Sequence, residues 1–420
     1  MEGEIITIGD ELISGRVCDL NSCFLSGRIS SFGLKIKAVS SVGDDRDQIL
    51  DVLRRAVARS DFVVVCGGLG PTEDDITTEV AAECFDRRLL FNEGFLETIR
   101  GSLNKFGLPW IEGYRKLAYV PEGAELIAPR SACGFVLYHG RIPVFFLPGV
   151  PAEVRHITEK TLLPLLLSRN SQNVVVRQRV FKLFGPQEAQ IGEALEGLTG
   201  GDKRLLVGFY PNFPENHVTV TVRAGSEEEA ERLLAAAEAE IERRLGEFVV
   251  AKDASTLEES VGRLLREKGL LVAVAESCTG GLIGSRLTSI PGSSNYFERG
   301  LVVYSNRSKV ELLGIPAHIL EKHGAVSEEA ALRMARAVRK LSGTDLGLAS
   351  TGLAGPEGGT PEKPVGTVFI ALAGPEGVKA KRYKFAGRRD QITVLTAQTA
   401  LCWLYLYLSD RSLLDGRPDR

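Results

Sequence analysis

The chain has 420 residues, of which 44% are hydrophobic and 25% charged, a balance typical of folded globular proteins. Lys and Arg number 51 against 54 Asp and Glu, so the net charge is −3, and no global field attracts nucleic acid or an anionic membrane. We therefore expect neither as a partner, and small anionic ligands must be held by local groups. The length predicts two or three domains.

Cysteine usage and the N-terminus indicate the compartment. The seven cysteines are odd in number and form no C-x-x-C pair, which favours a reducing environment over a disulfide framework. The first four residues, MEGE, lack a positively charged region, and no apolar run approaches membrane-spanning length. We expect a cytoplasmic protein.

Residues 1–169 alternate short apolar runs with helical patterns. The buried run DFVVVC at 61–66 ends in two glycines and is typical of a parallel strand covered on both faces. This rhythm predicts a doubly wound α/β domain. The predicted strands are 4–8, 34–42, 61–66 and 144–147, and the predicted helices are 19–32 and 48–59.

Residues 174–252 predict a small α+β module in the order β-α-β-β-α. Ser226 is placed to cap its long second helix, whose apolar residues recur at helical spacing. The predicted strands are 174–184, 205–210 and 217–223, and the first helix is 187–198.

Residues 256–410 return to the α/β rhythm and predict a second α/β domain. The tail that follows is polar. The predicted helices are 257–268, 327–341 and 391–408, and the predicted strands are 270–275, 301–304, 345–350 and 366–373.

The segment 275–281, AESCTGG, lies at a strand-to-helix junction of this last domain. Such a junction presents backbone N–H groups at the positive end of a helix dipole, which suits an anion or an oxyanion. A hydroxyl at Ser277 is well sited to be a nucleophile. The alternative is that Ser277 only caps the helix.

The segment 304–309, YSNRSK, follows another apolar strand and should reach the same edge of the sheet. A desolvated Lys309 can lose its proton near neutral pH and act as the base that a serine nucleophile requires. The Tyr304 hydroxyl could relay or position that proton. Alternatively, Lys309 is solvated at a helix start and Tyr304 lies in the core.

A third segment, 350–360, also follows a strand and is rich in glycine. Its backbone could cradle a phosphate, or the segment could be a mobile connector. Cys278 is a rival nucleophile, but a cysteine hydrolase needs a histidine partner. The candidates, His318 and His323, lie in a predicted surface helix and loop, so Ser277 is favoured.

In the first domain, CGGLGPTEDD at 66–75 follows a buried strand and opens a helix. Its glycines and helix N-terminus favour a phosphate. Asp74 and Asp75 could hold a divalent metal, or could only stabilise the first helical turn. Asp10 and Glu11, after the first strand, could add carboxylates. Arg115 and Lys116 could neutralise phosphate or be solvated.

Together, the motifs of residues 256–408 resemble the nicotinamide-nucleotide amidase domain of the CinA family: AESCTGG, GLVVYSNRSKVELLG, HGAVSEEAALRMA and TGLAGPEGGTPEKPVGTVFIALA. The resemblance implies hydrolysis of nicotinamide mononucleotide to nicotinate mononucleotide and ammonia, without a cofactor. The family's catalytic residues fall on Ser277, Tyr304 and Lys309. Backbone N–H groups near 279–281 would hold the oxyanion. The residues assigned to the substrate and oxyanion site are Cys278, Thr279, Gly280, Gly281, Asn306, Thr351, Gly352 and Gly355.

Residues 1–168 resemble the molybdopterin-binding fold in its CinA version, through GDELISG, CGGLGPTEDDITTE, YRKLAYVPEGAEL and FFLPGVPAEV. That version implies ADP-ribose pyrophosphatase activity with a divalent cation (Mg, Mn or Co), alone or with potassium. The loop at 126–134 departs from the family pattern by being shorter and lacking an Asn, which puts this activity in doubt. The residues assigned to the nucleotide are Gly67, Gly68, Gly70, Pro71, Thr72, Arg115 and Lys116, and those assigned to the metal are Asp10, Glu11, Asp74 and Asp75.

The middle module resembles the family's KH-like unit. A nucleic-acid clamp of the GXXG type needs basic residues, and Gly200–Lys203 is a poor version. We interpret the module as a spacer or dimerisation element and expect a homodimer. Two other hypotheses stay open: a non-catalytic regulatory protein linked to competence or DNA damage, and a molybdopterin-binding protein.

Overall fold

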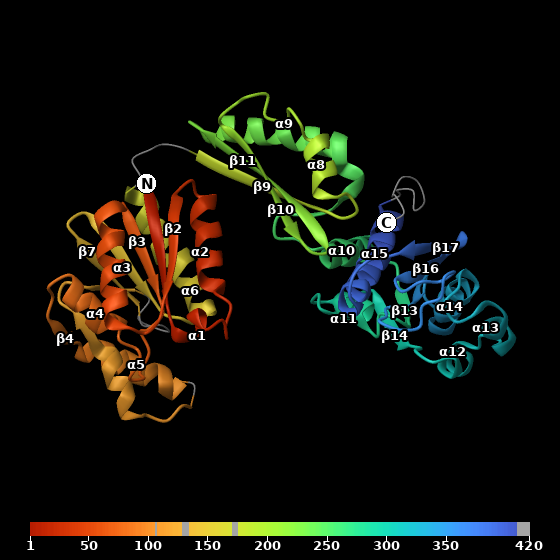
Figure 1. Cartoon of the computed structure of the whole chain (residues 1–420), viewed down its shortest axis with the longest axis horizontal. Coiled ribbons are helices and arrows are strands. Elements are labelled where there is room, and N and C mark those ends of the chain that lie inside the picture. The colour runs from red at the N-terminus through yellow and green to blue at the C-terminus, as the bar shows by residue number, and fades with distance from the viewer. Residues whose placement is uncertain (106, 128–133, 170–174, 410–420) are drawn as a thin grey trace. The chain divides into compact units, whose positions relative to one another are not determined.

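The computed structural model describes residues 1–105, 107–127, 134–169 and 175–409. Within this part of the chain each domain is built around its own sheet, and each is described by itself (Figure 1). The predicted positions of most strands and helices are confirmed to within a few residues.

The N-terminal domain has a six-stranded sheet in the order β2-β1-β3-β8-β7-β6. β1 pairs in parallel with β2 and β3, and β3 with β8, whereas β7 and β6 are antiparallel. The antiparallel edge arises because only Gly140 and Arg141 separate β7 from β8, which allows a hairpin but no crossover. The strands are β1 (Glu2–Ile8), β2 (Lys35–Val42), β3 (Phe62–Cys66), β6 (Glu125–Ile127), β7 (Gly134–His139) and β8 (Ile142–Leu147).

Helices cover both faces of this sheet, so the predicted doubly wound arrangement is confirmed (Figure 1). One core cluster packs α2 (Leu20–Ser31), α6 (Pro151–Ile157) and α7 (Leu163–Arg169) on one face. The other packs α3 (Arg46–Arg59) and α4 (Thr77–Cys84) on the opposite face. The remaining elements are α1 (Asp10–Ile13), β4 (Leu89–Phe91), α5 (Glu93–Lys105), the 3-10 helix Glu112–Ala118, β5 (Tyr119–Pro121) and the π-helical turn Thr158–Leu162.

The middle module has a four-stranded sheet in the order β10-β11-β9-β12 and two helices. Ser226 accepts a hydrogen bond from the backbone N–H of Glu229 at 3.2 Å, so its predicted capping role is confirmed. The fourth strand, β12, was not predicted from the sequence. The elements are β9 (Val175–Leu183), α8 (Glu188–Ala194), β10 (Leu205–Asn212), β11 (Glu215–Ala224), α9 (Glu227–Leu245), the 3-10 turn Gly246–Phe248 and β12 (Val249–Lys252).

The C-terminal domain has a five-stranded sheet in the order β14-β13-β15-β16-β17. The first three strands are mutually parallel, and β16 and β17 are antiparallel to their neighbours. The sequence did not predict β17, because an exposed edge strand carries no continuous apolar run. The strands are β13 (Val272–Glu276), β14 (Phe297–Val302), β15 (Leu346–Gly352), β16 (Thr367–Gly374) and β17 (Gly377–Lys384).

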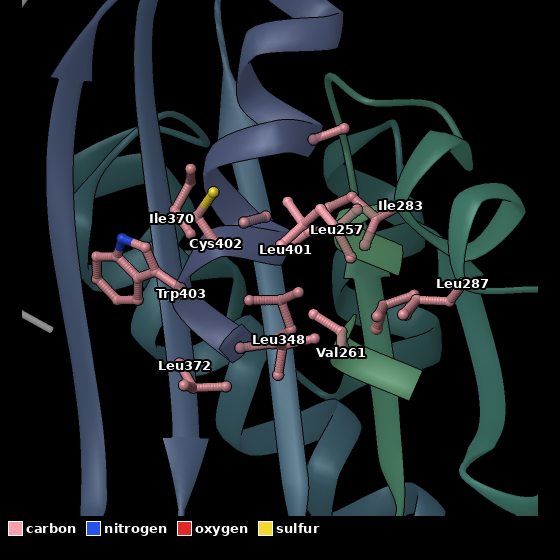
Figure 2. Close-up of a cluster of buried hydrophobic side chains, with 14 of the residues drawn as sticks. Leu257, Val261, Ile283, Leu287, Leu348, Ile370, Leu372, Leu401, Cys402 and Trp403 are labelled. Carbon is pink, nitrogen blue, oxygen red and sulfur yellow. The ribbon is translucent and has the colours of Figure 1, made fainter. Parts of the chain in front are cut away.

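Helices again cover both faces. α10 (Leu257–Lys268), α11 (Leu282–Thr288) and α15 (Arg389–Leu408) share one core with the sheet, and Figure 2 shows that their side chains meet those of β15 and β16. α13 (Ala317–His323) and α14 (Glu328–Ser342) pack on the other face. α12 (Asn306–Leu313) follows β14, and the 3-10 turn Ser293–Asn295 precedes β14.

Two further expectations concern the whole chain. None of the helices in the described ranges is long and apolar enough to cross a membrane. Cys18, Cys23, Cys66, Cys84, Cys278 and Cys402 are free thiols.

We expect Leu348→Ala to destabilise the C-terminal domain by about 2–5 kcal/mol, because Leu348 is fully buried between the sheet and its helices and a cavity would remain. The matched control is Leu341→Ala, where the side chain is 51% exposed and the cost should stay within about 0.5 kcal/mol. Denaturant titration in a Trp110→Phe background, where buried Trp403 reports on this domain, measures both. Equal costs for the two variants would contradict the assigned core.

Candidate functional site

The C-terminal sheet brings three loops to one edge. β14, β13 and β15 lie side by side and run in the same direction, with Glu276 opposite Val302 on one side and Ser350 on the other. The carboxyl ends of adjacent parallel strands meet at one edge, where open α/β sheets bind ligands. The three candidate segments of the sequence therefore converge.

Ser277 and Lys309 are in direct contact at this edge. The Lys309 Nζ lies 3.1 Å from the Ser277 Oγ. Ser277 directly follows β13, and Lys309 lies in the first turns of α12, where its side chain is fully buried. The predicted proximity of the two groups is confirmed, and the alternative that Lys309 is solvated is wrong.

Lys309 has an environment that weakens its hold on a proton. Its Nζ also contacts the backbone carbonyl oxygens of Val303 at 2.7 Å and Tyr304 at 3.1 Å. No carboxylate pairs with it in the described ranges, and burial lowers the pKa of Lys309 to about 8. A neutral amine can donate its two hydrogens to these carbonyls and accept the Ser277 hydroxyl proton on its lone pair.

Tyr304 occupies a different position from the one predicted. Its side chain is 60% exposed, so it lies outside the core. Its hydroxyl accepts a hydrogen bond from Arg389 Nη2 at 2.9 Å, and Arg389 Nη1 donates to the Gly355 carbonyl at 2.6 Å. Among the described contacts none joins the Tyr304 hydroxyl to Ser277 or Lys309, so the structure shows no direct relay through it.

Cys278 is poorly placed to attack. Its side chain is buried, and this burial raises the pKa of the Cys278 thiol to about 12. A thiol needs to be a thiolate to act as a nucleophile. Both candidate partners, His318 and His323, are exposed on α13, and no hydrogen bond of the described residues joins either to Cys278. The preference for Ser277 agrees with this geometry.

Not all of the backbone N–H groups that were predicted to hold the oxyanion, those near 279–281, are available to it. Gly280 N–H donates to the Ser277 carbonyl at 3.2 Å, and Gly281 N–H donates to the Glu276 carboxylate at 3.0 Å. Neither group is therefore free to hold an oxyanion, whereas Thr279 remains a candidate. Ser277 does not cap α11 either, since Glu276 accepts the N–H groups of that helix.

The third segment, residues 350–360, is fixed by contacts with other parts of the domain. Thr351 Oγ1 donates to the Ala325 carbonyl at 2.8 Å, so it anchors a neighbouring loop. A Cβ at Gly352 would lie 2.6 Å from the Val368 side chain, so close packing against β16 requires this glycine. Gly355 contributes its carbonyl to Arg389. Asn306 is the exposed first residue of α12.

The N-terminal domain contains a cavity of about 850 Å³, within the range of small-molecule sites. The glycine turn after β3 forms one wall. A Cβ at Gly67, whose φ is +110°, would lie 2.2 Å from the Ile8 carbonyl oxygen, so only glycine fits there. Six predicted residues line the cavity: Glu11, Gly67, Gly68, Gly70, Pro71 and Asp75.

Of the predicted acidic residues, Asp10 and Asp75 accept hydrogen bonds from different loops. Asp10 and Asp44 each accept a hydrogen bond from the other's backbone N–H. Burial raises the pKa of Asp44, and the nearby charges of Asp10, Glu11 and Asp74 add to this rise. Asp75 instead accepts hydrogen bonds from Thr72. Within the described ranges, no group of three or more His, Cys, Asp or Glu side chains is arranged to hold a metal ion.

The predicted basic residues lie outside the lining of the cavity. Lys116 Nζ donates to the Thr72 carbonyl at 2.8 Å, so it stabilises the loop that follows the glycine turn after β3. Arg115 stacks 5.1 Å above the Phe91 ring and lies 3.6 Å from a Glu112 oxygen. Residues 128–133 of the loop that departs from the family pattern lie outside the described residues.

Sequence reasoning missed three side chains of the C-terminal site. Glu276 was quoted within its motif without a role, Ser350 Oγ lies 2.7 Å from Thr279 Oγ1, and Arg389 comes from the start of the last helix. No pattern in the sequence links these positions. In the N-terminal cavity, the apolar lining from α5 and its surroundings was also missed: Phe95, Ile99, Leu103, Leu108, Tyr114 and Leu117.

Three family models match the chain: a CinA C-terminal domain over residues 254–408, a probable molybdopterin binding domain over 4–168, and the KH domain of damage-inducible protein CinA over 178–251. A CinA-like protein of Syntrophus aciditrophicus is 46% identical over 410 residues, which are 96% of this chain and 97% of that protein. A CinA-like protein of Geobacter sulfurreducens is 44% identical over 401 residues, covering 95% and 97%. The crystal structure of the competence/damage inducible protein CihA of Agrobacterium tumefaciens is 41% identical, covers 36% of this chain and 94% of that chain, and has a TM-score of 0.35.

Proposed function

Because the chain belongs to the CinA family, we propose that its C-terminal domain is an amidohydrolase that converts nicotinamide mononucleotide to nicotinate mononucleotide and ammonia. The observation that carries this proposal is the 3.1 Å contact between the Ser277 hydroxyl and the fully buried Lys309 amine. A hydroxyl beside a desolvated amine is the arrangement that serine–lysine hydrolases use to activate the nucleophile.

In the proposed reaction, Ser277 Oγ attacks the amide carbon while its proton passes to Lys309 Nζ. The Lys309 ammonium then protonates the departing nitrogen, which leaves as ammonia. Water attacks the resulting ester and gives a proton to Lys309, which passes it to the departing Ser277 oxygen, so nicotinate mononucleotide, the free serine and the neutral amine are formed. The carbonyls of Val303 and Tyr304 stabilise the transient ammonium.

Arg389 supports a phosphorylated substrate. Its guanidinium contacts the Tyr304 hydroxyl and the Gly355 carbonyl, neither of which carries a charge. A guanidinium without a carboxylate partner in its contacts can bind a phosphate in bidentate fashion. We assign Arg389 to the phosphate of the mononucleotide and Tyr304 to the orientation of Arg389. A regulatory protein that binds nucleotides without turnover is the competing proposal.

We expect Ser277→Ala to lower the rate of ammonia release from nicotinamide mononucleotide by at least about 10³-fold, since nucleophile loss in comparable hydrolases has effects of this size or larger. Lys309→Met should do the same, because the hydroxyl loses its base. Cys278→Ala removes the rival thiol at the adjacent position but keeps the backbone N–H of residue 278, so it should keep kcat within about threefold. Unchanged turnover in both Ser277→Ala and Lys309→Met would reject the mechanism, and no ammonia release from the wild type would favour the regulatory protein.

The pH dependence of kcat/KM should report Lys309. Below a pH of about 8 the amine is protonated and cannot accept the serine proton, whereas above it the neutral base predominates. We therefore expect kcat/KM to rise about tenfold per pH unit below this value and to level off above it. Initial rates of ammonia release between pH 6 and 10 at low substrate, in constant ionic strength, measure this. A profile that is flat across pH 7–9 would contradict Lys309 as the base.

For the N-terminal domain we propose a nucleotide site in the 850 Å³ cavity, with ADP-ribose as the ligand that the family implies. The glycine turn offers close backbone approach, and the apolar wall around Phe95 offers a surface for a flat ring. Because the described carboxylates form no metal-binding group, we derive no step of pyrophosphate cleavage through a metal.

Val17 lines this cavity and is 51% exposed, so a larger side chain in Val17→Trp should obstruct the cavity without disturbing the core. We expect the affinity for ADP-ribose, measured by titration calorimetry with Mg, Mn or Co present, to fall at least about tenfold. Val39→Trp, at a 48% exposed position outside the lining, is the control and should bind like the wild type. Co-purified molybdopterin with no ADP-ribose binding would support the molybdopterin-binding reading instead.

A further inference from the structure

Glu276 is a buried carboxylate directly before the proposed nucleophile. It is 1% exposed, and its side chain accepts three backbone hydrogen bonds. Gly281 N–H and Ile283 N–H donate to Oε2 at 3.0 and 3.1 Å, and Gly284 N–H donates to Oε1 at 2.8 Å. A carboxylate that receives three N–H groups is satisfied without a basic partner.

The backbone of Glu276 fixes the other end of the same turn. Its carbonyl accepts the Val303 N–H at 2.7 Å, just before the segment that carries Tyr304 and Lys309. The next N–H, that of Ser277, donates to the Ser350 carbonyl at 3.0 Å. Glu276 therefore links the start of the turn to the chain after β14 through its carbonyl and holds the end of the turn through its side chain, while the Ser277 N–H links the turn to β15.

The N–H groups of the turn can be accounted for one by one. Those of Ser277, Gly280 and Leu282 donate to backbone carbonyls, and the three named above donate to Glu276. Only the N–H groups of Cys278 and Thr279 then have no acceptor outside their own residue within the described ranges, and the Cys278 N–H faces its own thiol. Both residues are buried, at 7% and 4% exposed, and a buried N–H without a partner is rare in folded proteins.

We propose that the N–H groups of Cys278 and Thr279 form the oxyanion site, and that Glu276 is the positioning residue that leaves these two donors available. The inference rests on the proposed amidase function. In serine hydrolases with a nucleophile at a strand-to-helix turn, the N–H of the residue after the nucleophile holds the oxyanion. Here that residue is Cys278, and Ser277 N–H is already engaged.

A carboxylate is required for this role because it only accepts hydrogen bonds. A glutamine has the same shape, but its amide nitrogen would face one or more of the N–H groups that now donate to Glu276. The end of the turn would have to move, and the two free N–H groups would move with it. If Glu276 were only a helix cap, its loss would instead lower stability and leave the turnover of each folded molecule unchanged.

The test compares Glu276→Gln with Thr256→Ala in the full-length protein. Thr256 caps α10 through a reciprocal capping box with Glu259, so its loss destabilises the same domain without touching the turn. For Glu276→Gln we expect kcat for ammonia release to fall at least about tenfold per folded molecule, with KM within about twofold, because an oxyanion donor acts mainly in the transition state. Thr256→Ala should lower the melting temperature and keep kcat.

A second reaction separates this inference from the substrate assignment. The release of 4-nitrophenol from 4-nitrophenyl acetate reports acylation of Ser277, with Ser277→Ala as the blank. If the wild type acylates but releases no ammonia from nicotinamide mononucleotide, the proposed substrate is wrong, and a tenfold slower acylation in Glu276→Gln still supports the oxyanion site. Absence of any Ser277-dependent acylation overturns both proposals.

A variant at the donor itself covers the case in which Glu276→Gln does not fold. Replacing the backbone N–H of Thr279 by an ester oxygen removes one proposed donor and leaves the Thr279 hydroxyl contact with Ser350 in place. We expect the acylation rate to fall by at least about tenfold. An acylation rate within twofold of the wild type in this variant, or in folded Glu276→Gln, overturns the assignment.

Discussion

The contact on which the C-terminal site depends is the one between the buried amine of Lys309 and the hydroxyl of Ser277. Lys309 is fully buried, and among the described residues its Nζ has three hydrogen-bonded oxygen neighbours, none of them a carboxylate. A carboxylate partner would hold the proton on the lysine and remove the base. Two backbone carbonyls instead satisfy the amine hydrogens, so the lone pair can point at Ser277. Burial thus costs the fold some stability and gives the amine a pKa of about 8.

The parallel strands explain how this contact is maintained. Ser277 follows β13, and the chain leading to Lys309 follows β14, its direct neighbour in the sheet. Glu276 links the ends of these two strands, because its carbonyl accepts the Val303 N–H. Its carboxylate accepts the Gly281 N–H at the start of α11. The distance between Ser277 and Lys309 is therefore set by backbone pairing between two strands, which is stiffer than contacts between loops.

Glycines that follow strands have different structural roles in the N-terminal and C-terminal domains. In the N-terminal domain, Gly67 lies where any side chain would meet the Ile8 carbonyl, so the turn follows the first strand closely and forms a wall of the cavity. In the C-terminal domain, Gly352 is required by packing against Val368, and the segment contributes a carbonyl to Arg389 through Gly355. A glycine-rich loop after a strand thus lines a cavity in one domain and packs closely against a strand in the other.

The sequence by itself determined the order and type of most elements, because apolar periodicity and caps such as Thr256 and Ser226 act over a few residues. It also predicted that Ser277 and Lys309 lie close together, since strands of a predicted parallel sheet end at a common edge. Only the tertiary structure decided that Tyr304 contacts Arg389, that Gly281 N–H belongs to Glu276, and that Asp10 pairs with Asp44. These contacts join backbone and side-chain groups from separate elements, and which partner each group finds depends on packing geometry that no local pattern encodes.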